Sequence, residues 1–123
     1  AVADAPGTLT LNYNATDSYT TSASLFPHAQ EPDQIEVPVV ALGQYLNEAG
    51  LDTVDLLKLD CEGAEYAIVD GLAEADFGKI RAIAVETHPG PSANQNRDAL
   101  AENLCQQGYH VQTERSKIWA WRK

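Results

Sequence analysis

The chain has 123 residues, enough for one domain with a hydrophobic core and too few for two. Its 18 acidic and 8 basic residues give a net charge of −10 at pH 7, which argues against nucleic acid or an anionic membrane as a partner. Cys61 and Cys105 lack the spacing of a metal site, so we expect free, buried thiols in a cytoplasmic protein, with a disulfide as the alternative.

Residues 1–40 are predicted to form a hairpin and a loop. Apolar and polar residues alternate over residues 9–13 and again over residues 35–39, the period of strands with one buried face. We expect these strands to pair, with Pro38 facing an edge because it has no N–H to donate. Residues 14–34 between them are rich in small polar residues and predict a long loop, a kind of segment that is often functional or mobile.

Residues 41–123 are predicted to form an α/β core, so that residues 1–123 make a single domain. The periodicity predicts helices and strands in turn: a helix over 42–49, a strand over 54–59, a helix after Gly63, a strand over 80–85, a helix over 94–107, and strands over 109–113 and 118–121. Alternation of this kind implies right-handed crossovers and a parallel sheet. The last two strands are expected to form an antiparallel hairpin at one edge of that sheet.

The run over residues 54–59 is the centre of the predicted sheet. Its successive apolar residues fit a strand that helices cover on both faces. Ligands of such sheets bind beyond the carboxyl ends of the strands. This strand ends in Asp60 and Glu62, and Glu65 follows in the first helical turn, where the helix dipole favours negative charge.

The next predicted strand ends in Glu86 and His88. Because neighbouring parallel strands end at one rim, we expect Asp60, Glu62, Glu86 and His88 to converge there. Three carboxylates and an imidazole could bind a divalent metal or act as the general base for a hydroxyl acceptor. The alternative is a solvated acidic rim without chemistry.

Three other features have a structural and a functional interpretation. Lys58 interrupts the apolar run, and we expect its stem to lie on the sheet while its ammonium group reaches a rim carboxylate, with a catalytic role as the alternative. The acidic neighbours of Cys61 raise the pKa of its thiol, which favours a structural role. Trp119 and Trp121 share one face of the last strand and are expected in the core or as cover for an edge.

The stretch Asp55–Glu65 (DLLKLDCEGAE) resembles the signature of FkbM-type S-adenosylmethionine-dependent methyltransferases, in which a hydrophobic strand runs into Lys-x-Asp-x-Glu-Gly-Ala-Glu. A strand that ends in Val85–Pro89, the helix after it and Gly108–Tyr109 extend the resemblance over nearly all of the chain. It corresponds to roughly the C-terminal half of such an enzyme. The resemblance therefore implies part of a Rossmann-like, class I methyltransferase sheet.

The resemblance also implies methyl transfer from S-adenosylmethionine to a hydroxyl of a small molecule, such as a sugar or a polyketide. The roles that it implies are Asp60 and Glu62 on the acceptor side, Asp60 also near the cofactor, Glu86 and His88 as base or metal ligands, and Glu65 and Lys58 as substrate contacts. The glycine-rich cofactor turn of the family is not found, because the eight glycines form no G-x-G-x-x-G.

Two other functions stay open beside the methyltransferase. One is a non-catalytic α/β module that binds a small molecule or a partner at the acidic rim. The other is a metal-dependent hydrolase that uses the same rim. In the family order, the strand over residues 54–59 pairs with a first strand that this chain is predicted to lack. We expect the hairpin or a second copy of the chain to cover the bare edge, and we predict a homodimer through it.

Overall fold

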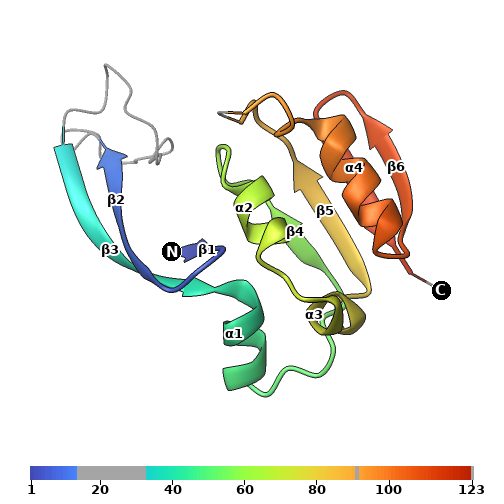
Figure 1. Ribbon diagram of the computed structural model, residues 1–123, viewed down its shortest axis with the longest axis horizontal. Helices are drawn as coiled ribbons and strands as arrows, with labels where there is room; N and C mark the ends of the chain where they lie inside the picture. The colour runs from blue at the N-terminus through green and yellow to red at the C-terminus, as the bar shows by residue number, and fades with distance from the viewer. Residues whose placement is uncertain (14–32, 91, 123) are drawn as a thin grey trace.

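The computed structural model describes residues 1–13, 33–90 and 92–122, which form two sheets and four helices (Figure 1). The elements are β1 (Val2–Ala3), β2 (Gly7–Tyr13), β3 (Asp33–Ala41), α1 (Leu42–Glu48), β4 (Leu57–Leu59), α2 (Glu65–Asp70), α3 (Glu74–Lys79), β5 (Ala82–Glu86), α4 (Arg97–Gln106), β6 (His110–Glu114) and β7 (Lys117–Trp121). The chain is therefore a mixed α/β protein, as predicted.

The first sheet contains the predicted hairpin. Its strand order is β1-β3-β2, and β2 pairs antiparallel with β3 so that Leu9 lies opposite Val37. The short β1 runs parallel to β3, and the amino group of Ala1 donates to the carbonyl of Pro38 at 2.6 Å. Most of the predicted loop, residues 14–32, lies outside the described residues.

The second sheet has the strand order β4-β5-β7-β6. The pair β4 and β5 is parallel, with Lys58 opposite Ala84, and β7 runs antiparallel to both β5 and β6. The parallel pair and the C-terminal hairpin are thus confirmed. The predicted strand over residues 54–59 is shorter, because the chain bends at Asp55 and Val54 contributes only an isolated bridge to Ile80.

Helices cover one face of the second sheet. Leu59, Ile83, Val85, Ile118 and Ala120 point from that face into the core, where α2 and α4 pack in front of the strands in Figure 1. The alternate residues point to the other face. The prediction that the central strand is covered on both faces is therefore wrong for the part of the chain that the structure describes.

The open face of the second sheet carries both tryptophans. Trp119 and Trp121 are 38% and 42% exposed, so they do not lie in the core. In the paired strand β5 the open face presents two small, half-buried residues. Ala84 is the register partner of Trp119, and Ala82 is the register partner of Trp121. The tryptophans thus shield neighbouring backbone while staying partly in water, a common position for an amphipathic ring.

The outer edge of β4 has no strand beside it among the described residues, because the hairpin belongs to a separate sheet. The predicted homodimer through this edge stays a prediction. The hairpin is instead joined to the α/β core through α1, where Leu46 enters the core and Asn47 accepts a hydrogen bond from Lys79 at 2.6 Å. No helix in the described ranges is long and apolar enough to span a bilayer.

Substitution of Leu104 by alanine tests where the core lies. Leu104 is 0% exposed, so we expect Leu104→Ala to lower the free energy of unfolding by about 2–5 kcal/mol through lost burial and a residual cavity. The matched control is Leu56→Ala, the same change at a side chain that is 60% exposed, which we expect to change stability by about 0.5 kcal/mol or less. Urea unfolding followed by circular dichroism measures both, and equal losses would contradict this assignment of the core.

Candidate active site

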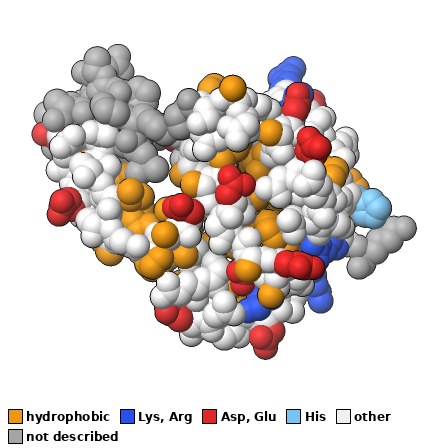
Figure 2. All heavy atoms as spheres, viewed as in Figure 1, with side chains coloured by type: hydrophobic (Ala, Val, Ile, Leu, Met, Phe, Trp, Pro, Cys, Tyr) orange, Lys and Arg blue, Asp and Glu red, His pale blue; other side chains and the backbone are white. Residues whose placement is uncertain are grey.

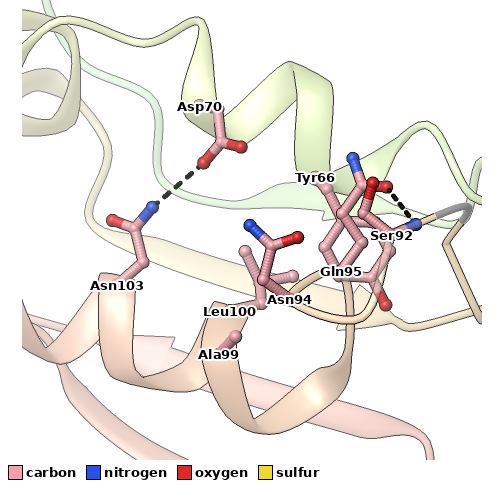
Figure 3. A pocket seen from close by; sticks show the side chains of 8 residues that line it. All are labelled: Tyr66, Asp70, Ser92, Asn94, Gln95, Ala99, Leu100 and Asn103. Atoms are coloured by element: carbon pink, nitrogen blue, oxygen red, sulfur yellow. Dashed lines mark hydrogen bonds between the residues drawn. The ribbon is translucent and has the colours of Figure 1, made fainter.

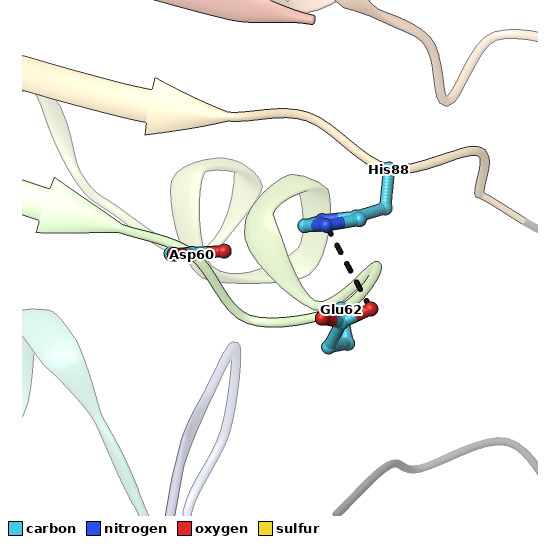
Figure 4. Close-up of side chains that lie close together, drawn as sticks. All are labelled: Asp60, Glu62 and His88. Atoms are coloured by element: carbon cyan, nitrogen blue, oxygen red, sulfur yellow. Dashed lines mark ion pairs between the residues drawn. The ribbon is translucent and has the colours of Figure 1, made fainter. Parts of the chain in front are cut away.

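Three predicted site residues lie together where β4 and β5 end. Asp60 directly follows β4, Glu62 lies two residues further on, and His88 lies two residues beyond β5. One ligand atom from each side chain lies within 4.8 Å of the other two (Figure 4). We call Asp60, Glu62 and His88 the rim triad. The parallel pairing of the two strands brings them together, as expected for strand ends in an α/β sheet.

A tight turn after β4 shapes the rim triad. Glu62 and Gly63 have φ angles of 51° and 102°, both in the left-handed region that non-glycine residues rarely adopt. The turn directs two backbone N–H groups, those of Cys61 and Gly63, to the carboxylate of Glu65 at 2.8 and 3.0 Å. This carboxylate is 0% exposed and therefore anchors the turn from inside the protein.

Glu65 also fixes the orientation of His88. Its Oε1 lies 2.9 Å from Nδ1 of His88, and an ionised carboxylate can only accept, so Nδ1 carries the hydrogen. The hydroxyl of Tyr66 donates to the backbone carbonyl of His88 at 2.6 Å. With its ring held by Glu65 and its backbone by Tyr66, His88 turns Nε2 toward Glu62, whose Oε2 is 3.7 Å away. In the neutral tautomer this nitrogen offers a free lone pair to the rim.

The environment shifts the proton affinity of His88 upward. Partial burial lowers the pKa of its imidazole, but the hydrogen bond to Glu65 and the charges of Glu65, Glu62 and Asp60 together outweigh that effect. The net result is a pKa above the ordinary value for histidine. An imidazole held in this way can accept a proton from a bound group and retain it near neutral pH.

Cys61 lies between two members of the rim triad. Burial raises the pKa of its thiol most, and the charges of Glu65 and Asp60 raise it further, against a hydrogen bond with the Asp60 backbone that lowers it. The thiol therefore stays protonated at neutral pH and is a poor nucleophile. Cys61 is half-buried, packs against the hydrophobic core and is not bonded to Cys105, which agrees with the structural role inferred from the sequence. Cys105 is free but exposed, so the prediction of a buried thiol is wrong there.

The other predicted site residues do not reach the rim triad as ligands. Lys58 is 69% exposed, and its Nζ lies 3.2 Å from Oδ2 of Asp60, so it does reach a rim carboxylate but is not buried. Glu86 alternates with the core residue Val85 and so points to the open face, beside Lys58 and Lys117. Glu65 is sealed in the interior, so any effect it has on a ligand passes through His88.

A polar cavity that the sequence did not reveal lies between α2 and α4 (Figure 3). It has a volume of about 280 Å³, and the side chains that line it are Tyr66, Asp70, Ser92, Asn94, Gln95, Ala99, Leu100 and Asn103. Asn103 donates to Asp70 across it at 3.3 Å. These residues come from α2, from the segment before α4 and from α4 itself, and only tertiary packing places them around one space.

The fold and the rim triad define an α/β protein whose candidate site lies at the carboxyl ends of two parallel strands. Comparison with known sequences identifies the family. The sequence model of the family described as "Methyltransferase FkbM domain" matches residues 1–111. The chain therefore belongs to the FkbM methyltransferase domain family.

Three curated relatives are similar to parts of the chain. The AMB antimetabolite synthetase AmbE of Pseudomonas aeruginosa is 38% identical over 73 residues, which cover 57% of this chain and 3% of AmbE. The 31-O-demethyl-FK506 methyltransferase FkbM of Streptomyces tacrolimicus is 34% identical over 95 residues, which cover 75% of this chain and 35% of that enzyme. The methyltransferase sdnD of Sordaria araneosa is 33% identical over 73 residues, which cover 59% of this chain and 27% of sdnD.

The chain thus spans about a third or less of the length of each of these relatives. No solved structure shows a significant match to it.

Replacement of Glu65 by glutamine tests its role as an anchor. Glutamine has the same shape, but its amide nitrogen is a donor, so at least one of the three groups that now face the carboxylate loses its acceptor. We expect Glu65→Gln to lower the free energy of unfolding by about 1–3 kcal/mol. The matched control is Glu102→Gln on the exposed face of α4, where we expect a change below about 0.5 kcal/mol. If the two variants lost equal amounts of unfolding free energy relative to the wild type, the anchoring role would be contradicted.

The raised pKa of His88 predicts a pH dependence of stability. The folded protein binds the imidazole proton more tightly than the unfolded chain does, so this contribution is fully present below the unfolded pKa of about 6.5. It is lost as the pH rises through the higher pKa of the folded state. In metal-free buffer, we expect the difference in unfolding free energy between wild type and His88→Gln to shrink between pH 6 and pH 9. A difference that stays constant over this range would show that the contacts of His88 do not depend on its charge.

Proposed function

We propose that the chain is part of an S-adenosylmethionine-dependent O-methyltransferase that acts on a hydroxyl of a small molecule, such as a sugar or a polyketide. Membership of the FkbM methyltransferase domain family supports the methyl transfer. The observation that carries the assignment of a site is the rim triad, with His88 oriented by a buried carboxylate at the carboxyl ends of parallel strands. We further propose that β4-β5-β7-β6 is half of a Rossmann-like, class I methyltransferase sheet.

The glycines of the described residues do not supply a cradle for the cofactor. A Cβ atom would collide with the chain's own atoms at three of them: Gly43 against Asp76, Gly71 against Asp4 and Gly90 against Gln95. The close approaches at these glycines are therefore already taken by the fold itself. At Gly7 and Gly78 nothing lies within 4 Å, so no close packing requires glycine there. These glycines do not fit the cofactor, so the roles proposed for the rim triad concern the acceptor.

The rim triad fits the acceptor side of such a reaction. An attacking hydroxyl must give up its proton as its oxygen forms the new bond, and a positioned group at the site speeds this transfer. The lone pair on Nε2 of His88 can take that proton directly, while Glu65 stabilises the imidazolium through Nδ1. Alternatively, a cation held by the triad can make the hydroxyl more acidic. Either way, Asp60 and Glu62 are close enough to orient the acceptor.

A second candidate function is a non-catalytic α/β module that binds a small molecule at the rim. The observation that favours it is the same set of glycines, because the close approaches at Gly43, Gly71 and Gly90 are taken up by the chain's own atoms. Under this proposal the rim triad still binds a ligand, but the chain turns nothing over. A metal-dependent hydrolase is a third candidate, and the three ligand atoms of the rim triad are what it would require.

Titration of the 123-residue chain with S-adenosylmethionine, by calorimetry with and without Mg²⁺, separates the first two candidates. The methyltransferase proposal predicts saturable binding, with the cradle completed by residues outside the described ranges or by a second copy. His88→Ala is the control, because it changes the acceptor side and should leave cofactor binding as it is. Absence of a binding heat up to about 1 mM cofactor would favour the non-catalytic module for this chain. A dissociation constant of about 1 mM corresponds to a binding free energy of only about −4 kcal/mol.

A further inference from the structure

We infer that the rim triad is a binding site for one divalent cation, held by carboxylate oxygens of Asp60 and Glu62 and by Nε2 of His88. The role of the ion rests on the proposed function, since it would serve to activate the acceptor hydroxyl. The binding of the ion does not rest on the proposed function, and this binding can be measured without cofactor or acceptor.

The spacing of the ligand atoms fits a single ion. Oxygen and nitrogen ligands lie about 2.0–2.2 Å from a bound transition metal, so two ligands of one ion are separated by roughly 3.0–4.4 Å. The three atoms of the rim triad lie within 4.8 Å of one another, so small rotations of the exposed carboxylates suffice to close the site. Nε2 of His88 and Oε2 of Glu62 are 3.7 Å apart, too far for a hydrogen bond and suitable for two ligands of one ion.

Glu65 supplies an independent reason, because it prepares His88 as a ligand without being one itself. Histidines that bind metals usually donate their other ring N–H to a carboxylate or carbonyl, which fixes the tautomer and makes the coordinating nitrogen more basic. Here a carboxylate with 0% exposure accepts from Nδ1, and backbone N–H groups of Cys61 and Gly63 hold it in place. The lone pair of Nε2 therefore points into the rim, where Asp60 and Glu62 are the nearest partners.

The charge balance of the rim also favours a cation. Asp60 and Glu62 carry two negative charges, and with His88 neutral, Lys58 is the one described cationic side chain that pairs with either of them. Lys58 is 69% exposed, so solvent weakens this pairing. Figure 2 shows acidic side chains spread across the visible face rather than gathered at one spot. The net charge of −10 thus attracts cations in general, and the rim triad provides the specific ligands.

A bound cation explains why two carboxylates lie beside the acceptor site, whereas His88 acting alone as a base does not. As a hydroxyl gives up its proton, negative charge develops on its oxygen, and two adjacent carboxylates would oppose that charge. A bound divalent cation reverses the local electrostatics and lowers the pKa of a coordinated hydroxyl. With three protein ligands, the ion keeps open positions for water and for the acceptor oxygen.

The donor set indicates which ions to expect. Two carboxylate oxygens and one imidazole nitrogen suit Mn²⁺, Fe²⁺, Co²⁺ and Zn²⁺, whereas Mg²⁺ and Ca²⁺ prefer sites made of oxygen alone. Mn²⁺ is a suitable probe because its binding can be followed by electron paramagnetic resonance as well as by heat. We therefore expect tighter binding of Mn²⁺ than of Mg²⁺ or Ca²⁺.

The experiment is a titration of the chelator-treated 123-residue chain with Mn²⁺ in the absence of cofactor and acceptor. We expect one site per chain and a loss of affinity of tenfold or more in Asp60→Asn, Glu62→Gln and His88→Ala. Glu65→Gln should weaken binding by about 10–100-fold although Glu65 is not a ligand. The matched control is Glu86→Gln, the same change at a strand-end carboxylate that is not one of the three ligands, and it should bind as the wild type does.

Thermal unfolding of each variant establishes that it is folded under the conditions of the titration. If Glu65→Gln fails to fold, Glu62→Gln and Asp60→Asn still decide the proposal, because both side chains are exposed. Absence of binding up to about 1 mM Mn²⁺ would overturn it. So would binding that Asp60→Asn and His88→Ala leave unchanged. Cofactor binding without Mn²⁺ binding would refute the cation site alone and leave His88 as the base, whereas Mn²⁺ binding without cofactor binding would count against the methyltransferase proposal alone.

Discussion

The rim depends on one buried charge, the carboxylate of Glu65. Placing an ionised carboxylate in the interior is costly unless hydrogen bonds compensate it, and here the N–H groups of Cys61 and Gly63 and the imidazole of His88 do so. These three partners come from the turn after β4 and from the segment after β5. A single side chain on α2 therefore joins two strand ends that the sheet brings near each other but does not by itself fix in place.

Strand register explains which predicted residues reach the rim. Leu59 lies opposite Val85 in the parallel pair, and both side chains point into the core under the helices. In β5 the next residue, Glu86, points the other way and lies on the open face with Lys58. Asp60, Glu62 and His88 all lie outside the strands, two of them after β4 and one after β5. Residues beyond the strand ends, rather than residues at the ends, are thus the ones that converge.

The sequence predicted the hairpin, the parallel pair β4–β5 and the meeting of Asp60, Glu62 and His88, because these depend on local periodicity and on the general geometry of α/β sheets. It could not predict that, among the described residues, helices cover only one face of the second sheet. An apolar run does not indicate whether one or two layers of helices pack on a strand. The sequence placed Glu65 in the first turn of a helix, as found, but as a substrate contact, whereas the structure buries its carboxylate completely. The contact that buries Glu65 joins it to a residue 23 positions away, and such a contact leaves no periodic signal.

Among the described residues, the hydrogen bonds and the ion pair that join Lys58, Asp60, Glu65 and His88 to the rim lie between residues 58 and 88. Thr87, beside His88, is also hydrogen-bonded to Ser116 in the turn between β6 and β7. The signature Lys-x-Asp-x-Glu-Gly-Ala-Glu can be understood in these terms: Asp60 and Glu62 belong to the rim triad, Gly63 permits the turn, and Glu65 secures the turn together with His88. Tyr66 links this unit to the polar cavity between α2 and α4, because its side chain lines the cavity and its hydroxyl donates to the backbone carbonyl of His88. The rim and the cavity are therefore coupled through one side chain, and a change in the packing around the cavity can reach the segment that carries His88.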